Sequence, residues 1–172
     1  STIFFLKVLF PHFSNKKINV FDIGCANGYH SAEFHKYFSN CSYMGSDISK
    51  SIILKANSEY SDSKTSFCVD DCRILNNSFN EKYNIVFSSR ALYYVSPEIS
   101  SVLENIKSYL VNDGIFSFVY NQKTDSFTNQ YLTYSLLRSL LIQNGFKENL
   151  FVEFNRFSSE TIAVGIYTLP KI

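Results

Sequence analysis

The chain has 172 residues, of which 45% are hydrophobic, and its formal net charge at pH 7 is +1. This length supports one domain with a sizeable core, and the balanced charge disfavours a nucleic-acid partner, which a basic surface would attract. No stretch reaches the roughly 18 apolar residues of a membrane helix, and residues 1–7 lack the basic flank and cleavage site of a signal peptide. We therefore expect a cytoplasmic domain without membrane contact.

The cysteines give no sign of a metal site. Cys25, Cys41, Cys68 and Cys72 form no CxxC pair and no His/Cys cluster with zinc spacing. Three of them fall in or beside predicted strands, so we expect reduced, buried thiols.

The first half of the chain alternates between strand and helix patterns. A short apolar run at 18–23 ends in a glycine-containing turn, as a buried parallel strand does. We expect a helix at 29–38, a strand at 42–47, a helix that Ser49 caps, and a strand at 65–69. In the Ser49 helix, Ile52, Ile53 and Ala56 should share the buried side.

The second half continues this alternation and then changes. A strand is expected at 83–88, and Ser96-Pro97 should begin a helix that runs to Leu110. Residues 112–114 predict a turn before a fifth strand at 115–120. A last helix is marked by apolar residues at helical spacing and should end near Asn144-Gly145, where glycine can close it: Phe127, Tyr131, Tyr134, Leu137 and Leu141.

The tail predicts an antiparallel hairpin. Two strand-like runs, at 150–157 and 161–169, are joined by three residues only, which is too short for a parallel crossover. The whole pattern predicts an α/β fold, a three-layer αβα sandwich whose mostly parallel seven-stranded sheet ends in this hairpin. We divide the single domain, 1–172, into a lead-in at 1–17, a ligand-binding α/β core at 18–147 and the hairpin at 148–172.

A glycine-rich loop, Asp22-Ile23-Gly24-Cys25-Ala26-Asn27-Gly28, follows the first strand. Its glycines let the backbone turn tightly and approach a ligand at the next helix N-terminus. By itself such a loop is also a plain strand-to-helix connection. Ala26 and Tyr29 stand where a dinucleotide fingerprint has its second and third glycines, so a nicotinamide-dependent oxidoreductase is a weaker alternative.

The loop resembles motif I of the class I S-adenosylmethionine-dependent methyltransferases through Asp22, Gly24, Ala26 and Gly28. Gly45-Ser46-Asp47-Ile48-Ser49 resembles the family motif whose acid binds both ribose hydroxyls. A carboxylate such as that of Asp47 can accept from two neighbouring hydroxyls at once. The alternative for Asp47 is an acid that only complements a helix dipole.

Further motifs follow in the family's order. Val69-Asp70-Asp71-Cys72 resembles the motif whose acid accepts from the adenine amino group, with Asp71 aligning best and Asp70 as the alternative. Residues 84–95 resemble the fourth-strand motif, although Asn84 stands where an acid is common, and residues 109–114 resemble the turn before the fifth strand. The signature of DNA amino-methyltransferases, Asn/Asp-Pro-Pro-aromatic, is absent, which argues against base methylation.

The resemblance implies an S-adenosylmethionine-dependent methyltransferase acting on a small-molecule, peptide or protein acceptor. The cofactor-binding residues that it implies are Asp22, Gly24, Cys25, Ala26, Asn27, Gly28, Asp47, Ile48, Asp71, Cys72 and Ser88. The alternative is a catalytically inactive methyltransferase-fold subunit or interaction domain of a larger enzyme. The intact glycine loop and Asp47 favour the active enzyme.

Methyl transfer to a good nucleophile requires alignment more than acid-base help. Side chains near the acceptor should follow the fourth and fifth strands: Ser89, Arg90, Tyr93, Tyr94, Tyr120 and Asn121. The tyrosines are alternatively packing residues and Arg90 a surface ion-pair partner. None of the histidines is expected to act as a base, since His30 should be packed and His35 should face solvent, and no feature singles out His12.

The segments that usually form a lid are short. Little chain precedes Ile18, and only residues 121–126 join the fifth strand to its helix. We therefore expect an open site that takes a large acceptor, or one that a partner chain or a flanking segment completes. The hydrophobic residues 3–10 either fold over this site or pack on the core.

Overall fold

A seven-stranded sheet in the order β3-β2-β1-β4-β5-β7-β6 organises the chain. The structure is a computed structural model that describes residues 1–79, 82–123, 132–157 and 160–170. Strands β1 to β5 pair in parallel, and β7 pairs antiparallel with both β5 and β6. The strand bounds are β1 Ile18–Ile23, β2 Cys41–Asp47, β3 Thr65–Val69, β4 Tyr83–Ser89, β5 Leu110–Lys123, β6 Lys147–Phe157 and β7 Glu160–Thr168.

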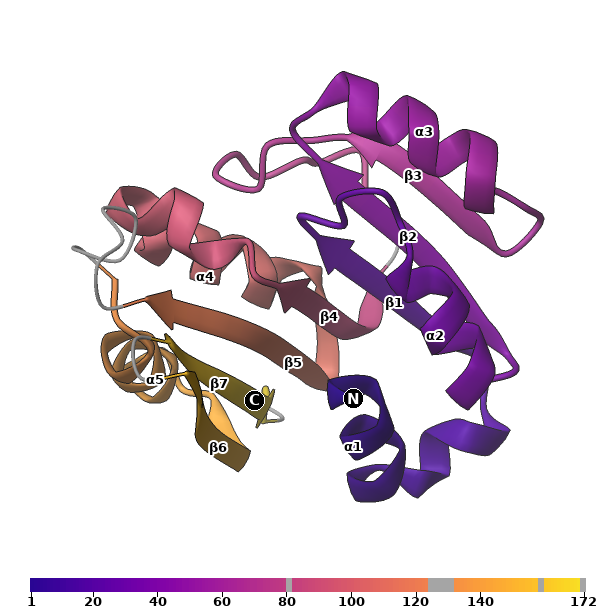
Figure 1. The fold of residues 1–172 in the computed structure, drawn as a ribbon. Helices are drawn as coiled ribbons and strands as arrows, with labels where there is room; N and C mark the ends of the chain where they lie inside the picture. Colours follow the sequence, from indigo (N-terminus) through magenta and orange to yellow (C-terminus); the bar gives the residue numbers. More distant parts are fainter. Residues whose placement is uncertain (80–81, 124–131, 158–159, 171–172) are drawn as a thin grey trace.

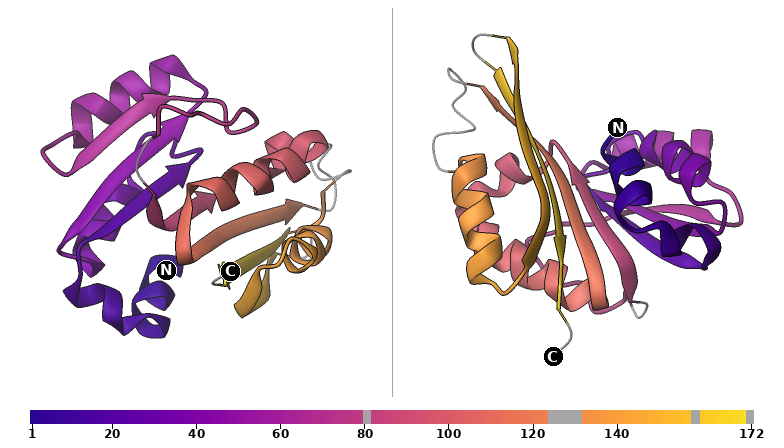
Figure 2. Two further views of the ribbon diagram at one scale, coloured as in Figure 1. Left: turned by 180° about the vertical axis from the view of Figure 1, so that it is seen from behind. Right: turned by 90° about the horizontal axis from the view of Figure 1, so that it is seen from below.

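Helices cover both faces of the sheet (Figures 1 and 2). One face carries α1 (Thr2–Leu9), α2 (His30–Tyr37) and α3 (Lys50–Tyr60), and the other carries α4 (Ile99–Tyr109) and α5 (Tyr134–Gln143). Two short 3-10 helices, η1 (Pro11–Asn15) and η2 (Leu92–Glu98), precede β1 and α4. The αβα sandwich with a closing hairpin is the predicted architecture.

Alternating side chains divide the core into two layers. Successive residues of a strand point to opposite faces, so Phe21 joins the α4–α5 layer and its neighbour Val20 joins the α1–α3 layer. Likewise Phe116 packs with α4 and α5, and Ile115 packs on the other side. The central strands β1 and β4 are thus buried on both faces, which explains why the sequence of each is mostly apolar. In β2 and β3, buried residues alternate with partly or fully exposed ones.

Several local predictions are confirmed. The strand at 65–69 has the expected bounds, the hairpin is antiparallel, and Gly145 adopts the left-handed conformation, with φ +85°, just after α5. Ser49 is the N-cap residue of α3, but its side chain makes no capping hydrogen bond. Phe127 and Tyr131, predicted to lie in the last helix, fall outside the described residues.

Other expectations are wrong at the level of single residues. Ser96-Pro97 does not begin α4, because both residues lie in η2 and α4 begins at Ile99. Strand β5 begins at Leu110, through a bulge where Asp113 has φ +58°, rather than after the turn. Ile52 is 37% exposed, so Ile53 and Ala56 alone form the buried side of α3.

The opening segment both packs on the core and approaches the carboxyl ends of the strands. Ile3 and Leu6 of α1 are buried in the α1–α3 layer, while Phe4, Phe5 and Val8 are each more than 40% exposed. Among the described residues, no helix combines the length and the apolar character needed to cross a membrane.

Candidate active site

The loop between β1 and α2 is fixed against the end of β2. The backbone N–H groups of Gly24 and Cys25 both donate to the carbonyl oxygen of Ser46, at 2.8 and 2.9 Å. Gly24, Ala26 and Gly28 have positive φ angles of +71°, +49° and +81°. Three left-handed residues within five positions make a tight turn, and the strain at Ala26, which has a Cβ, is typical of functional loops.

The two loop glycines are also required by packing within the protein. A Cβ on Gly24 would lie 2.3 Å from the Cβ of Ala91, and a Cβ on Gly28 would lie 2.5 Å from the ring of Phe67. From the sequence, a side chain on either glycine is predicted to intrude on a ligand or to force an unfavourable backbone angle, and both glycines do have positive φ angles. In the structure the protein itself already fills the space beside both glycines.

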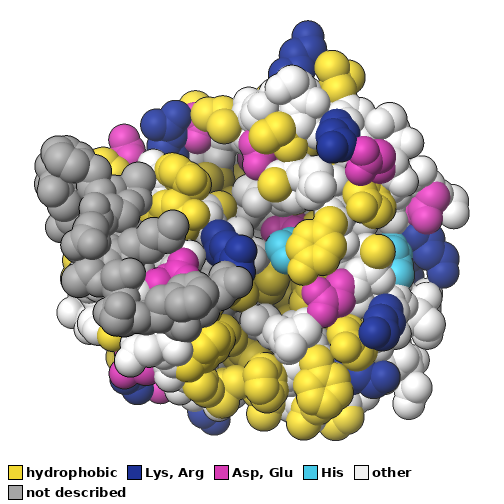
Figure 3. Space-filling view, viewed as in Figure 1, with side chains coloured by type: hydrophobic (Ala, Val, Ile, Leu, Met, Phe, Trp, Pro, Cys, Tyr) yellow, Lys and Arg dark blue, Asp and Glu magenta, His cyan; other side chains and the backbone are white. Residues whose placement is uncertain are grey.

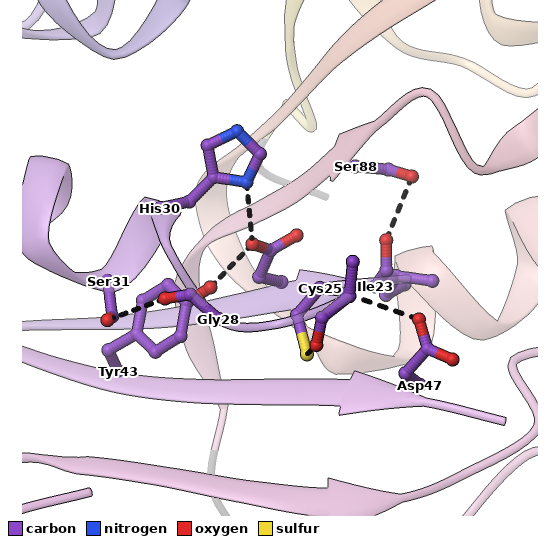
Figure 4. A network of polar contacts seen from close by, with 10 residues as sticks. Ile23, Cys25, Gly28, His30, Ser31, Tyr43, Asp47 and Ser88 are labelled. Carbon is purple, nitrogen blue, oxygen red and sulfur yellow. Dashed lines mark hydrogen bonds and ion pairs between the residues drawn. The ribbon is translucent and has the colours of Figure 1, made fainter. Parts of the chain in front are cut away.

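Asp47 holds the glycine loop through its side chain. Its Oδ2 accepts a hydrogen bond from the backbone N–H of Ala26 at 3.2 Å, and its Oδ1 accepts one from the N–H of Ser49 at 2.9 Å. A carboxylate has about four acceptor positions, so it can still bind two hydroxyl groups. Asp47 thus joins the first and second strand ends at one carboxylate (Figure 4).

The neighbouring acids Asp70 and Asp71 follow β3 and differ in their contacts. Asp71 binds Arg73 through both oxygens, with its shortest contact, Oδ2 to Nη2, at 2.7 Å, and this interaction holds the pKa of Asp71 below its usual value. Asp70 accepts from Asn76 at one oxygen, and its other oxygen is buried without a hydrogen bond. Burial raises the pKa of Asp70.

These loops surround a cavity of about 980 Å³ at the carboxyl ends of the parallel strands. This volume is at the upper end of the usual range for small-molecule sites, roughly 300–1,000 Å³. Figure 3 shows the molecule hollowed on this face, with a histidine, hydrophobic side chains and charges of both signs around the hollow.

Most of the residues predicted to contact a cofactor line this cavity. They are Gly24, Cys25, Ala26, Asn27, Asp47, Ile48, Asp71 and Cys72. Asp22, Gly28 and Ser88 are not among the lining residues: Asp22 and Ser88 are completely buried, and Ser88 donates from its hydroxyl to the carbonyl of Ile23 at 3.0 Å. The next residue, Ser89, lines the cavity instead.

Beneath the loop, Asp22 lies in a buried polar group with Tyr43 and His30 (Figure 4). The Tyr43 hydroxyl donates to Asp22 Oδ2 at 2.5 Å, and His30 Nδ1 lies 3.4 Å from the same oxygen, which is ion-pair distance but does not meet hydrogen-bond geometry. Burial and the Asp22 carboxylate raise the pKa of Tyr43. His30 packs edge-on against Phe87, as expected of a packed residue, but it also lines the cavity.

Past β4, four of the six predicted acceptor-side residues line the cavity: Ser89, Arg90, Tyr93 and Tyr94. Tyr120 and Asn121 do not line it, and Tyr120 is buried. Arg90 has φ +60°, and its backbone N–H donates to the carbonyl of Val119 at 2.8 Å. Tyr93 packs edge-on against the buried Tyr120, and burial raises the pKa of Tyr93 to about 12. Tyr94 is 70% exposed, which is inconsistent with the alternative that it packs under the sheet.

Two sequence expectations about polar groups need correction. His35 does not simply face solvent, because its Nε2 lies 2.8 Å from the hydroxyl of Thr65, and burial lowers its pKa. The four thiols are free, but only Cys25 and Cys41 are buried, while Cys68 and Cys72 are half-buried. Within the part of the chain that the structure describes, no three His, Cys, Asp or Glu side chains are grouped as a metal site requires.

The cavity also has walls that the sequence did not predict. Tyr29, His30 and Glu33 enter from the start of α2, where the boundary of a helix decides which residues face the sheet. Phe5 of α1, Phe154 of β6, and Ile162 and Val164 of β7 also line it. Phe5 belongs to the hydrophobic segment 3–10, for which folding over the site is one of the two predicted alternatives. Alternation along the hairpin strands signals the other three residues, but it does not say which face meets the site.

Comparison with known proteins agrees with this geometry. Residues 14–147 match the family model described as "Methyltransferase domain". The chain is 27% identical, over 118 residues, to malonyl-[acyl-carrier protein] O-methyltransferase 1 of Ilyobacter polytropus; the match covers 67% of this chain and 43% of that protein. The chain thus spans less than half the length of this curated relative.

Solved structures share the whole fold. The N-methyltransferase NodS from Bradyrhizobium japonicum superposes with a TM-score of 0.79 and 15% identity, covering 99% of this chain and 94% of that one. The structure of NodS in complex with S-adenosyl-L-homocysteine gives a TM-score of 0.76 and 16% identity, and the match covers 99% of this chain and 86% of the NodS chain. The sheet order, the cavity at the strand ends and the family match together show that the chain belongs to the class I S-adenosylmethionine-dependent methyltransferase domains.

Proposed function

We propose that the cavity holds S-adenosylmethionine along the ends of β1, β2 and β3 and presents its methyl group to an acceptor near the end of β4. The observation that carries this proposal is the contact between Asp47 and the glycine loop, since Asp47 Oδ2 accepts from the Ala26 N–H at 3.2 Å. It places a carboxylate with free acceptor positions beside a loop whose backbone lines the same cavity.

The lining residues fit the parts of this cofactor. Asp47 would accept hydrogen bonds from the ribose hydroxyls, Ile48 and Cys72 would flank the adenine, and the loop from Gly24 to Asn27 would meet the amino-acid end. S-adenosylmethionine supplies an activated methyl group on a sulfonium, so the chain's own task is to bind, to align and to exclude water.

For the adenine amino group we propose Asp71 as the acceptor, with Asp70 as the alternative. The carboxylate of Asp71 is 24% exposed at the cavity, whereas the free oxygen of Asp70 is inaccessible to solvent. Asp71→Ala should therefore weaken binding of S-adenosylhomocysteine by about tenfold, and Asp70→Ala should weaken it less. Isothermal titration calorimetry measures both affinities. If Asp70→Ala weakens binding more than Asp71→Ala does, Asp70 rather than Asp71 is the acceptor for the adenine amino group.

Asp22, Gly28 and Ser88 support the site from beneath in this proposal. Asp22 and Ser88 are wholly buried, and Gly28 provides a left-handed turn against Phe67. We also propose that the chain is a single domain with a lead-in at 1–17, a core at 18–147 and a hairpin at 148–172, and that a partner chain or a flanking segment completes the acceptor side.

Calorimetric titration with S-adenosylmethionine, S-adenosylhomocysteine and NAD tests the proposal directly. We expect saturable binding of the first two and none of NAD. Binding of NAD alone would favour an oxidoreductase and overturn the assignment. Binding of the two methionine-derived ligands without release of S-adenosylhomocysteine in the presence of an acceptor panel would instead support the inactive-subunit alternative.

A further inference from the structure

The walls of the cavity differ in chemistry from one end to the other. Asp47, Asp70 and Asp71 lie at the β2–β3 end, where the cofactor is proposed to bind. At the opposite end the lining is hydrophobic and comes from three strands and a helix. We call these residues the apolar wall: Phe5, Val119, Phe154, Ile162 and Val164.

The strand register places the sheet part of this wall on one face. Val119 of β5 pairs with Val164 of β7, and two residues along β7, Ile162 pairs with Phe154 of β6. Residues two apart in a strand share a face, so these side chains form a continuous surface across β5, β7 and β6. Ile162 and Val164 are buried and Phe154 is 49% exposed, which means that the surface leads from the cavity outward to the edge strand β6.

Arg90 lies at the inner end of this surface. Its backbone N–H donates to the carbonyl of Val119, the residue of the apolar wall that belongs to β5. Among the described residues, the cavity is lined by two arginines, Arg73 and Arg90. Arg73 is paired with Asp71, whereas none of the described carboxylates lies within ion-pair distance of Arg90.

The backbone of Arg90 is held in an unusual conformation. Its φ of +60° is left-handed, which costs free energy for a residue with a Cβ and persists only where the surrounding structure enforces it. The Arg90 side chain itself is exposed and lines the cavity. A guanidinium with no ion-pair partner among the described carboxylates is suited to a ligand carboxylate, because its fork of N–H donors matches the two oxygens.

We propose that the methyl acceptor is an amphipathic carboxylate: its carboxylate binds Arg90 and its aliphatic chain lies along the apolar wall toward β6. This inference rests on the proposed function, because it assigns the part of the cavity that the cofactor leaves free. The charge complements Arg90, and the length of the wall across three strands suits an extended chain rather than a compact ring.

The test uses decanoate, decanol and decyltrimethylammonium as probes, each below its aggregation concentration, titrated calorimetrically into protein saturated with S-adenosylhomocysteine. We expect decanoate to bind at least tenfold more tightly than decanol, and the cationic probe to bind more weakly than either. Arg90→Gln should remove the preference for decanoate, and Arg90→Lys should retain part of it. Phe154→Ser should weaken decanoate and decanol by the same factor.

Two matched variants control for general effects. Lys107→Gln removes a positive charge from α4, and Ile142→Ser removes an exposed apolar side chain from α5 on the other face of the sheet. Neither should change probe binding. Each of three results would overturn the proposal. The first is equal affinity for decanoate and decanol, and the second is an unchanged preference for decanoate in folded Arg90→Gln. The third is a loss of probe affinity in Ile142→Ser as large as that in Phe154→Ser.

The proposed function is tested separately, by titrating S-adenosylhomocysteine into the protein without probe. If this ligand fails to bind, the cofactor assignment fails whatever the probes do. If it binds and the probes show no preference for the carboxylate, only the acceptor inference fails.

Discussion

Replacing Asp47 with alanine tests the centre of the proposed cofactor site. The side chain accepts hydrogen bonds from the N–H groups of Ala26 and Ser49, and it is proposed to accept two more from the ribose hydroxyls. The variant therefore loses both the ligand contacts and the tie that holds the glycine loop to β2. Asp47→Asn keeps one acceptor oxygen and should show a smaller effect.

The magnitude follows from hydrogen bonds to a charged acceptor, which contribute about 1.5–3 kcal/mol. Affinity for S-adenosylhomocysteine should therefore fall roughly tenfold to a hundredfold in Asp47→Ala. The unfolding free energy of the ligand-free variant should fall by only about 0.5–1.5 kcal/mol. The Ala26 N–H is exposed, so water can take the place of the Asp47 carboxylate as its acceptor.

Calorimetric titration gives the affinity, and urea unfolding followed by circular dichroism shows that each variant is folded. Glu104→Ala is the matched control, since it removes an exposed carboxylate from α4 without touching the cavity. If folded Asp47→Ala binds S-adenosylhomocysteine within twofold of the wild type, Asp47 does not hold the ribose and the proposed placement of the cofactor is wrong.

Three further predictions concern other groups at the cavity and one control position. In urea titrations, Gly24→Ala should lower the unfolding free energy by about 1–3 kcal/mol more than Gly145→Ala does. Both positions have positive φ, but only a Cβ at position 24 would collide with Ala91. Equal losses in the two variants would contradict this. Because burial raises the pKa of Asp70, its ionisation opposes folding, and the stability it contributes is lost as pH rises through its folded pKa. The unfolding free energy of Asp70→Asn minus that of the wild type should therefore increase as the pH rises from about 4 to about 7. If this difference stays constant or decreases, the carboxyl of Asp70 does not have a raised pKa. Burial raises the pKa of Cys72 to about 11, so a disulfide reagent should label Cys72 slowly at pH 8 and faster as the pH rises. Bound S-adenosylhomocysteine should slow the labelling further. If the ligand leaves the labelling rate unchanged, Cys72 is not part of the proposed site.

The features that the sequence predicts well are those that local physics decides. Mostly apolar segments mark β1 and β4, since a strand covered on both faces needs few polar residues. Gly145 marks the end of α5 because glycine adopts positive φ without a steric cost. The glycine loop is recognisable for the same reason.

The errors occur where tertiary packing decides the outcome. A Ser-Pro pair is a good helix start, and the chain bends at Val95, with φ −112° and ψ 24°, just before the pair. After this bend Ser96 and Pro97 form a short 3-10 segment, and the α-helix begins only at Ile99. His35 lies on α2 at a position expected to face water, yet strand β3 brings Thr65 to its imidazole. Pairing between segments 30 residues apart leaves no trace in local periodicity.

The place of the hairpin relative to the site is likewise not a local property of the sequence. The apolar runs predict its two strands, but their alternation is compatible with either face meeting the cavity. The register of β7 on β5 decides which face meets the cavity, because it pairs Val164 with Val119. Val119 in turn accepts a hydrogen bond from the backbone N–H of Arg90, the residue directly after β4. The apolar wall is thus a consequence of strand pairing rather than of any sequence motif.

The residues of the glycine motif divide into two layers with different physical tasks. Gly24 and Ala26 line the cavity, whereas Asp22 is completely buried, does not line it and holds the Tyr43 hydroxyl. A buried carboxylate is costly unless its oxygens are bonded or paired, and the Tyr43 hydroxyl and the nearby His30 provide this compensation for one oxygen. Because the loop must turn tightly enough to present its backbone to a ligand, it needs such a support beneath it. Matching a binding motif therefore identifies the loop, but burial decides which of its residues can touch what the loop binds.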